Sequence, residues 1–153
     1  MDDFNTGAVN EFDLPVSYAN TIEPYKRPLS SMSPAVFTDA ATGTVRLVIG
    51  ASGGPKILTA VAYTALRHLW LEENIKASID SCRPHDQLFP EQVVYEPCFP
   101  TSILDSLRFR SHNVTELPRG VRGAVVMAIE QSPDGSVIRA NSDYRKGGTI
   151  AGE

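Results

Sequence analysis

Apolar residues recur at regular intervals from residue 35 onward, and their spacing predicts strands that alternate with helices. Alternation predicts a short strand at 35–38 and a second at 44–49, which the glycine-rich run 50–54 then interrupts. From 56 to 73 the spacing becomes helical, and Pro55 stands near the first turn, where a missing N–H costs little. The predicted apolar face of this helix, together with a core tryptophan at its end, consists of Leu58, Val61, Ala62, Ala65, Leu66, Leu69 and Trp70.

The second half of the chain predicts two further helices, one short strand and a hairpin. The expected elements are a helix at 75–82, a strand at 93–95, a helix at 101–109, and hairpin strands at 123–130 and 136–141. The run Ser132-Pro133-Asp134-Gly135 supplies the hairpin turn, because proline fixes φ and glycine tolerates positive φ. Strands interleaved with helices indicate a layered α/β or α+β fold.

Residues 1–34 differ from the rest, because they show neither a helical nor an alternating period. The segment holds Pro15, Pro24, Pro28 and Pro34 and is rich in Gly, Asn and Ser. A stretch of this length without its own secondary structure is unusual unless it is functional or belongs to a larger body. We therefore expect an extended lead-in at 1–34 and an α/β core at 35–153.

Charge and composition exclude several classes of protein. In 153 residues, 14 Lys and Arg stand against 18 Asp and Glu, which gives a net charge of −4, and the basic residues are scattered. Nucleic acid is therefore not an expected partner. The apolar runs fall far short of the roughly 20 residues that cross a bilayer, and the acidic start does not resemble a signal peptide.

Two cysteines and one sequon bear on the compartment. The separation of Cys82 and Cys98 permits a disulfide, but spacing alone does not decide whether they are bridged. Asn113-Val114-Thr115 is a sequence for N-glycosylation, which is a weak indication of an extracellular protein.

The glycine run between the second strand and the first helix is the most informative local feature. Adjacent glycines at Gly53 and Gly54 permit a sharp turn that exposes N–H groups at a helix N-terminus. Such a loop binds an anion or an oxyanion, or it simply makes the turn. The adjacent hydroxyls of Ser30 and Ser31 likewise either bind a carboxylate or cap their own backbone.

Two other kinds of chemistry fit the residues less well. The glycine run 50–54 also matches the Gly-x-Ser-x-Gly motif of a hydrolase nucleophile elbow. In that interpretation Ser52 would be the nucleophile, with partners among Asp80, Asp86, Asp105, His85 and His112. Too few strands precede Ser52 for that fold. A metal set drawn from Cys82, His85, Cys98 and His112 matches no compact ligand spacing, so we expect no metal, and we expect His85 to fix the loop 83–90.

Four segments occur in order along nearly the whole chain. They are Asp2-Asp3-Phe4, Pro28-Leu29-Ser30-Ser31-Met32, Val48-Ile49-Gly50 with Gly53-Gly54, and Asp143-Tyr144-Arg145-Lys146-Gly147-Gly148. Taken together they resemble the gamma-glutamyltransferase (glutathione hydrolase) family. The serine pair followed by a strand and a double glycine is the most specific part of the match.

The resemblance implies an α+β fold of the N-terminal-nucleophile hydrolase type, an αββα sandwich of which this chain is the later part of the small subunit. It implies that Asp3 binds the α-amino group of a γ-glutamyl substrate and that Ser30 and Ser31 bind its α-carboxylate. Gly53 and Gly54 would form the oxyanion hole. It implies no cofactor and no metal, and as partners glutathione or other γ-glutamyl compounds and a large subunit.

One departure from the family pattern matters for activity. In the family a nucleophilic threonine stands upstream of Asp-Asp-Phe, and no threonine occupies that place here. We therefore expect a small-subunit fragment that is inactive alone; the alternative is a non-catalytic light chain that binds or regulates a large subunit. The resemblance places the protein at the extracellular face of the plasma membrane, with any membrane attachment in the missing part.

Overall fold

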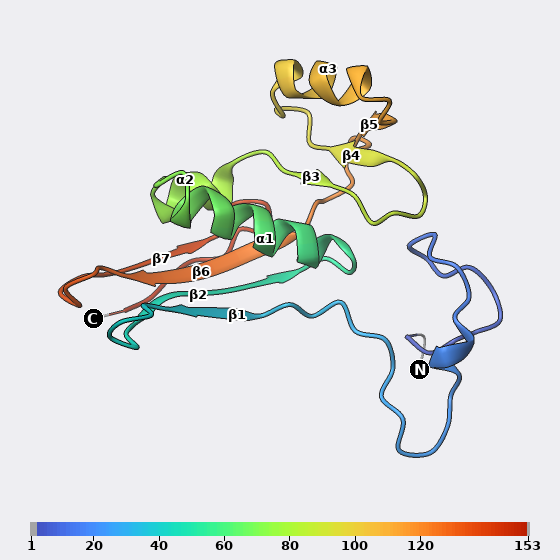
Figure 1. The fold of residues 1–153 in the computed structure, drawn as a ribbon, viewed down its shortest axis with the longest axis horizontal. Coiled ribbons are helices and arrows are strands. Elements are labelled where there is room, and N and C mark those ends of the chain that lie inside the picture. Colours follow the sequence, from blue (N-terminus) through green and yellow to red (C-terminus); the bar gives the residue numbers. More distant parts are fainter. Residues whose placement is uncertain (1–2, 153) are drawn as a thin grey trace.

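The computed structural model describes residues 3–152, in which a four-stranded antiparallel sheet is covered on one face by two helices (Figure 1). The strand order is β1-β2-β6-β7, and the two helices lie above the sheet. Met1, Asp2 and Glu153 lie outside the described residues, so the Asp2 position of the first motif is not placed. The elements of this layer are β1 Ala35–Thr38, β2 Val45–Ser52, α1 Lys56–Leu69, α2 Ile75–Asp80, β6 Val125–Gln131 and β7 Ile138–Ser142.

The core lies between this sheet and the two helices, and strand alternation decides which residues enter it. Ile49 of β2 stands opposite Ala128 of β6 in the ladder, and both are buried beneath α1. Their neighbours Val48 and Met127 point to the other face and are 42% and 52% exposed. One face of the sheet is therefore a packed core, whereas the other face carries apolar side chains that no helix of the described residues covers.

The face that helix α1 turns to the core matches only partly the one that its apolar spacing predicts: Val61 and Ala65 are buried as predicted. Leu58 and Leu66 are 53% and 47% exposed, and Trp70, expected in the core, is 70% exposed. The prediction is wrong at these three positions because the helix carries two adjacent stripes of compatible residues, and the stripe with smaller side chains meets the sheet. The residues of α1 that are buried are Ile57, Ala60, Val61, Thr64 and Ala65.

The same helix ends four residues earlier than predicted. Its last residue is Leu69, and Glu72 has a φ of 54°. The amide of Glu73 then donates to the Arg67 carbonyl, which satisfies an acceptor at the helix end. A left-handed residue stops the helix where the apolar pattern alone continues.

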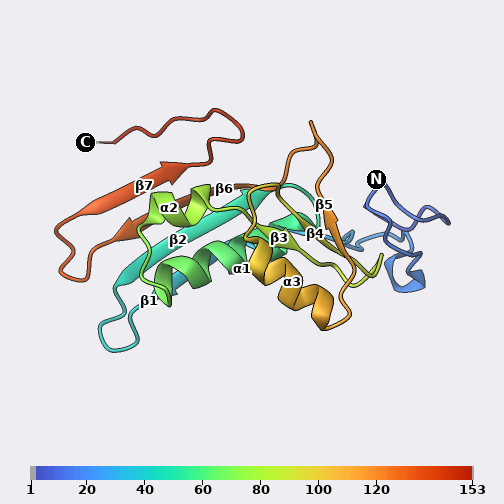
Figure 2. The same ribbon diagram turned by 90° about the horizontal axis from the view of Figure 1, so that it is seen from above.

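A smaller three-stranded sheet lies beside the main layer in the order β3-β4-β5 (Figure 2). Two of its strands, β3 and β5, are absent from the sequence prediction because two or three residues are too short to show a period. The elements are β3 Pro84–His85, β4 Val93–Tyr95, α3 Thr101–Phe109 and β5 Val114–Glu116. The pairing of β4 with β5 is parallel.

Residues 3–34 form the lead-in, which contains one short 3-10 turn, η1 Tyr18–Asn20, and lies to one side of the sheets (Figure 1). Asparagine side chains organise it: Asn10 accepts from the amides of Phe12 and Leu14, and Asn20 accepts from the Leu29 amide. None of the helices in residues 3–152 is long and apolar enough to cross a membrane.

Candidate functional site

The loop between β2 and α1 requires glycine at two adjacent positions, for two different reasons. Gly53 has a φ of 144°, and a Cβ there would lie 2.8 Å from the Cα of Ala124. Gly54 has a φ of 59°, and a Cβ there would lie 2.7 Å from the ring of Phe12. The loop is therefore held between the backbone at the start of β6 and an aromatic ring from the lead-in.

The two glycine amides stand at the N-terminal end of α1. Among the hydrogen bonds of residues 3–152, none has the amide of Gly53 or Gly54 as its donor, whereas the Gly54 carbonyl accepts from Ile57 at 3.0 Å. Unpaired amides at a helix N-terminus carry partial positive charge and suit an anionic acceptor. The geometry permits an oxyanion to bind here.

A hollow adjoins this loop on the side of the lead-in. It encloses about 560 Å³, counted out to its open mouth, and is lined mainly by lead-in residues, with Pro55 as its contribution from the start of α1. Asp3, Phe12 and Ser31 are among the lining residues. Residues that carry carboxylate, hydroxyl and side-chain amide groups thus line one open concavity.

The site residues that the sequence singles out are placed unevenly around this hollow. The Asp3 carbonyl accepts from the side chain of Asn20 at 2.7 Å and from the Leu29 amide at 3.3 Å, which brings Asp3 beside the serine pair. Ser31 lines the hollow, whereas Ser30 is exposed and its Oγ accepts from the Met32 amide at 3.2 Å. Gly53 and Gly54 are not among the lining residues; Phe12, which packs on Gly54, is.

His85 connects α1 to the lead-in through a chain of hydrogen bonds. Its Nδ1 lies 2.7 Å from the Thr59 hydroxyl, and its Nε2 lies 2.8 Å from Oε1 of Gln87. Nε2 of Gln87 donates to the Phe12 carbonyl at 2.7 Å. The sequence predicts that His85 fixes its own loop, and the contact with Gln87 agrees; no sequence signal pointed to Gln87 or Phe12.

Burial lowers the pKa of His85 below its ordinary value, and the nearby Lys56 ammonium lowers it further, while the Gln87 hydrogen bond and the Asp86 carboxylate oppose the shift. The residue as a whole is 9% exposed. The neutral form is therefore favoured at neutral pH, and it can accept at one ring nitrogen and donate at the other.

The Asp143-Tyr144-Arg145 motif forms a buried ionic network rather than part of the hollow. Asp143 contacts Arg83 at 2.8 Å and Arg145 at 2.9 Å, and Arg145 also contacts Glu96 at 2.6 Å. Burial by itself raises the pKa of Asp143, but hydrogen bonds from the Val126 and Arg145 amides and from both guanidinium groups lower it below its ordinary value. The network ties the segment after β7 to β3 and β4.

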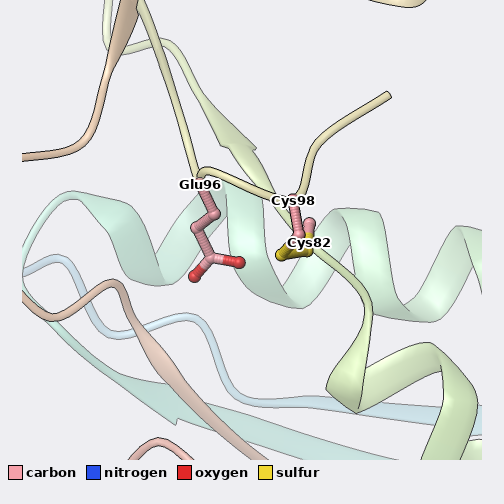
Figure 3. A group of neighbouring side chains, drawn as sticks. All are labelled: Cys82, Glu96 and Cys98. Atoms are coloured by element: carbon pink, nitrogen blue, oxygen red, sulfur yellow. A yellow bond between two sulfur atoms is a disulfide. The ribbon is translucent and has the colours of Figure 1, made fainter. Parts of the chain in front are cut away.

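Cys82 and Cys98 are joined by a disulfide, which settles the question that their spacing leaves open (Figure 3). Glu96 lies beside the pair, but its carboxylate already binds Arg145 and the Arg83 amide. Sulfur atoms in a disulfide are not thiolate ligands, so the metal set considered from the sequence has no cysteine donor.

Among the described residues, Ser52 lacks the hydrogen-bonded partner that a serine-hydrolase nucleophile would need. Ser52 is exposed at the end of β2, and no hydrogen bond of the described residues joins it to a histidine or an aspartate. His85 is instead bonded to Thr59 and Gln87. The triad geometry that the motif would require is therefore not present among residues 3–152.

Known proteins resemble this chain in both sequence and fold. Scoloptoxin SSD14 of Scolopendra dehaani is 42% identical over 153 residues, and the match covers 99% of this chain and 26% of that protein. Glutathione hydrolase proenzyme 2 of Schizosaccharomyces pombe is 39% identical over 118 residues, covering 76% of this chain and 19% of the relative. The chain therefore spans about a quarter or less of the length of these relatives.

A solved structure extends the likeness to three dimensions. The T380A mutant of Helicobacter pylori gamma-glutamyltranspeptidase superposes with a TM-score of 0.84 at 32% identity, covering 95% of this chain and 78% of that one. The α+β fold expected from the resemblance, that of the N-terminal-nucleophile hydrolases, is confirmed. The family description "Gamma-glutamyltranspeptidase" matches residues 1–153, and the chain belongs to this family.

Proposed function

We propose that this chain is the part of a gamma-glutamyltranspeptidase small subunit that binds the γ-glutamyl group of glutathione or a related compound and stabilises the oxyanion formed when that group is hydrolysed or transferred. The observation that carries the proposal is the hollow that Asp3 and Ser31 line together with Pro55, the residue after the double glycine. A carboxylate suits the substrate's ammonium group, and a hydroxyl suits its carboxylate.

The chemistry of the loop supports the second half of the proposal. When a nucleophile attacks the γ-carbonyl, negative charge develops on the carbonyl oxygen, and two N–H donors fixed in place lower the barrier without having to reorganise. The amides of Gly53 and Gly54 have no acceptor among the described residues and lie at the positive end of α1. Ser30 would join Ser31 at the α-carboxylate after its hydroxyl turns from the Met32 amide.

The threonine that the family pattern places before Asp-Asp-Phe is not among these 153 residues. In these 153 residues no threonine precedes Asp3, and Thr6 is the first in the chain. We therefore propose that the chain alone does not turn over γ-glutamyl amides, because binding groups and an oxyanion hole have no covalent adduct to stabilise. Pairing with a large subunit, which would cover the open apolar face of the sheet, belongs to the same proposal.

An oxidising compartment fits the structure. Disulfides persist in secreted proteins and on cell surfaces and are rare in the cytosol, and Cys82–Cys98 is closed. The side chain of Asn113, within the sequon, is exposed. We propose the extracellular face of the plasma membrane as the site of action.

Calorimetric titration of the chain with glutathione tests the binding site. We expect saturable 1:1 binding that is weakened at least about tenfold by Asp3→Asn and by Ser31→Ala, because each removes a group that faces the ligand. Ser33→Ala is the matched control: the same substitution two residues away, outside the hollow, should leave the affinity unchanged. Absence of binding, or equal weakening by Ser33→Ala, refutes the proposed site.

Hydrolysis of a chromogenic γ-glutamyl anilide tests the missing nucleophile. We expect no release of chromophore by the chain alone, and turnover comparable to a complete enzyme would refute this part of the proposal. Labelling with a fluorophosphonate tests the serine-hydrolase alternative, since covalent modification of Ser52 would identify a serine hydrolase instead.

A further inference from the structure

We infer that Gln87, itself oriented by His85, is a positioning residue that holds Phe12 against the glycine loop and so sets the direction of the Gly53 and Gly54 amides. The inference rests on the proposed function, because it serves the oxyanion-binding role given there to the loop. It adds two residues that touch neither the proposed ligand nor the reacting atoms.

For each hydrogen bond in the series from Phe12 through Gln87 and His85 to Thr59, the donor and the acceptor can be assigned. Nε2 of Gln87 lies 2.7 Å from the Phe12 carbonyl and 2.8 Å from the Phe89 carbonyl. Carbonyl oxygens only accept, so the NH2 group of Gln87 must face them and its Oε1 must face His85. In the neutral ring Nε2 then carries the proton. Nδ1, at 2.7 Å, accepts the single hydrogen of the Thr59 hydroxyl in preference to the Lys56 carbonyl, which lies at 3.3 Å.

This series of hydrogen bonds, from Thr59 through His85 and Gln87 to Phe12, provides the polar connection between the lead-in and the rest of the molecule. Among the hydrogen bonds and ion pairs of residues 3–152, the bond from Gln87 to Phe12 is the one that joins residues 3–34 to residues 35–152. The other polar contacts of the lead-in lie within it. The position of the lead-in beside α1 therefore depends on Gln87 more than on any other polar side chain.

Phe12 transmits that position to the loop. Its amide and that of Leu14 both donate to Oδ1 of Asn10, so residues 10–14 form a turn that holds its own shape. The ring of Phe12 packs directly on the Cα of Gly54, where an added Cβ would lie 2.7 Å from the ring. A turn that moves as one unit carries the ring with it, and the left-handed Gly54 has no side chain to resist the change.

The hydrogen bonds from Thr59 through His85 and Gln87 to Phe12 are partly sheltered from water. His85 is 9% exposed, and Thr59, which begins the chain, lies on α1 one turn after the glycine loop. Both ends of the chain therefore reach the same loop, one through the helix that the loop begins and the other through Phe12. Hydrogen bonds sheltered from water hold their partners more firmly than exposed ones.

Gln87→Glu is the sharpest variant, because it keeps the size of the side chain and its acceptor for His85 but removes the N–H donors that face two carbonyls. Gln92→Glu is its matched control: Gln92 lines a second cavity together with His85 and Gln87, its Oε1 accepts from Thr115, and among the described residues its side chain has no hydrogen bond to the lead-in. Both variants add one negative charge at neighbouring positions.

The readout is the ¹⁵N–¹H spectrum of the full chain without ligand, together with amide hydrogen exchange. We expect Gln87→Glu to move the Gly54 amide resonance and to speed exchange at Phe12 and Leu14 about fivefold, the loss expected for one hydrogen bond. Gln92→Glu should change neither. Protonating the introduced carboxylate at lower pH restores a donor and should return the Gly54 resonance toward its original position, which loss of packing alone would not do.

Two further variants keep the inference testable if Gln87→Glu does not fold. Thr59→Val removes the hydroxyl that faces Nδ1 of His85 and should move the Gly54 resonance in the same direction, whereas Thr59→Ser keeps the hydroxyl and should not. Phe12→Ala shows what complete loss of the ring does to that resonance. A Gly54 resonance that responds to Phe12→Ala but not to Gln87→Glu or Thr59→Val overturns the inference.

Glutathione binding distinguishes failure of this inference from failure of the proposed function. If the protein binds glutathione but its Gly54 amide resonance does not change in Gln87→Glu, the positioning role is refuted and the proposed site is not. If the protein binds no glutathione but its Gly54 amide resonance does change in Gln87→Glu, the proposed function is refuted, while the coupling between Gln87 and the loop is supported.

Discussion

The sheet-and-helix body and the lead-in are held together by different means, and the candidate site lies where they meet. The body, residues 35–152, has a packed core, a disulfide and a buried ionic network. The lead-in, residues 3–34, has an exposed ion pair, local asparagine bonds and one hydrogen bond to the body. The lining of the hollow, which comes from the lead-in except for Pro55, therefore depends on few contacts, whereas the glycine loop beside it belongs to the more firmly held body.

Ion pairs in the two regions should differ most in their effect on stability. Asp143→Ala leaves Arg83 and Arg145 buried without one of their counterions, so we expect the free energy of unfolding to fall by about 3–5 kcal/mol. Glu23→Ala in the lead-in removes an exposed partner of Lys26 at 4.0 Å and should cost less than about 0.5 kcal/mol. Urea denaturation measures both, and equal losses would contradict the comparison.

The disulfide should matter to the body and leave the lead-in unchanged. The bridge closes a loop between cysteines sixteen residues apart, so replacing both by serine should lower the free energy of unfolding by about 3 kcal/mol through the entropy of the unfolded chain. Hydrogen exchange should speed up in β4 and α3 and stay the same at the asparagine-bonded amides of the lead-in. Faster exchange throughout the lead-in would show that the two regions are coupled more strongly than their contacts indicate.

The elements of the body could be predicted because their signals are local. The strand, double glycine and helix at 44–73 follow from apolar spacing and from two residues that alone tolerate the turn. The buried face of α1 could be predicted only in part, since two adjacent stripes of the helix are apolar enough and the sheet decides between them. Both very short strands of the small sheet form through pairing with β4, and pairing leaves no period in three residues.

The site could be predicted only in part, for a related reason. Asp3, Ser31 and the two glycines belong to motifs that can be recognised in the sequence. Phe12 and Gln87 are 75 residues apart and meet through a backbone carbonyl, which is a contact that any residue type at position 12 would offer. Long-range contacts to the backbone leave no trace in composition or spacing.

Alanine at the two loop glycines should distinguish the firmly held body from the less constrained lead-in. At Gly53 the new Cβ meets the Ala124 backbone of the body, which cannot move aside, and we expect a loss of more than about 2 kcal/mol in the free energy of unfolding. At Gly54 the Cβ meets the Phe12 ring of the lead-in, which can shift, so a loss of about 1–2 kcal/mol is expected from the left-handed φ.

A double-mutant cycle checks the difference between these two glycines. Phe12→Ala should relieve part of the cost of Gly54→Ala, giving an interaction energy of about 0.5 kcal/mol or more, and should leave the cost of Gly53→Ala unchanged. Additivity at both positions would mean that the ring does not press on the loop.

The smallest expected effect is a pH dependence at the contact between the regions. Burial lowers the pKa of His85 in the folded protein, while the unfolded chain keeps the ordinary value of 6.5. Below that pH the unfolded chain takes up a proton that the folded one does not, so stability falls as pH drops from 6.5 to the folded pKa and levels off beneath it. Comparing the urea midpoints of the protein and of His85→Gln across this range isolates the effect from His68 and His112. A midpoint difference that stays constant with pH would mean that His85 is not held neutral, and that the link from Thr59 to Gln87 does not depend on its charge state.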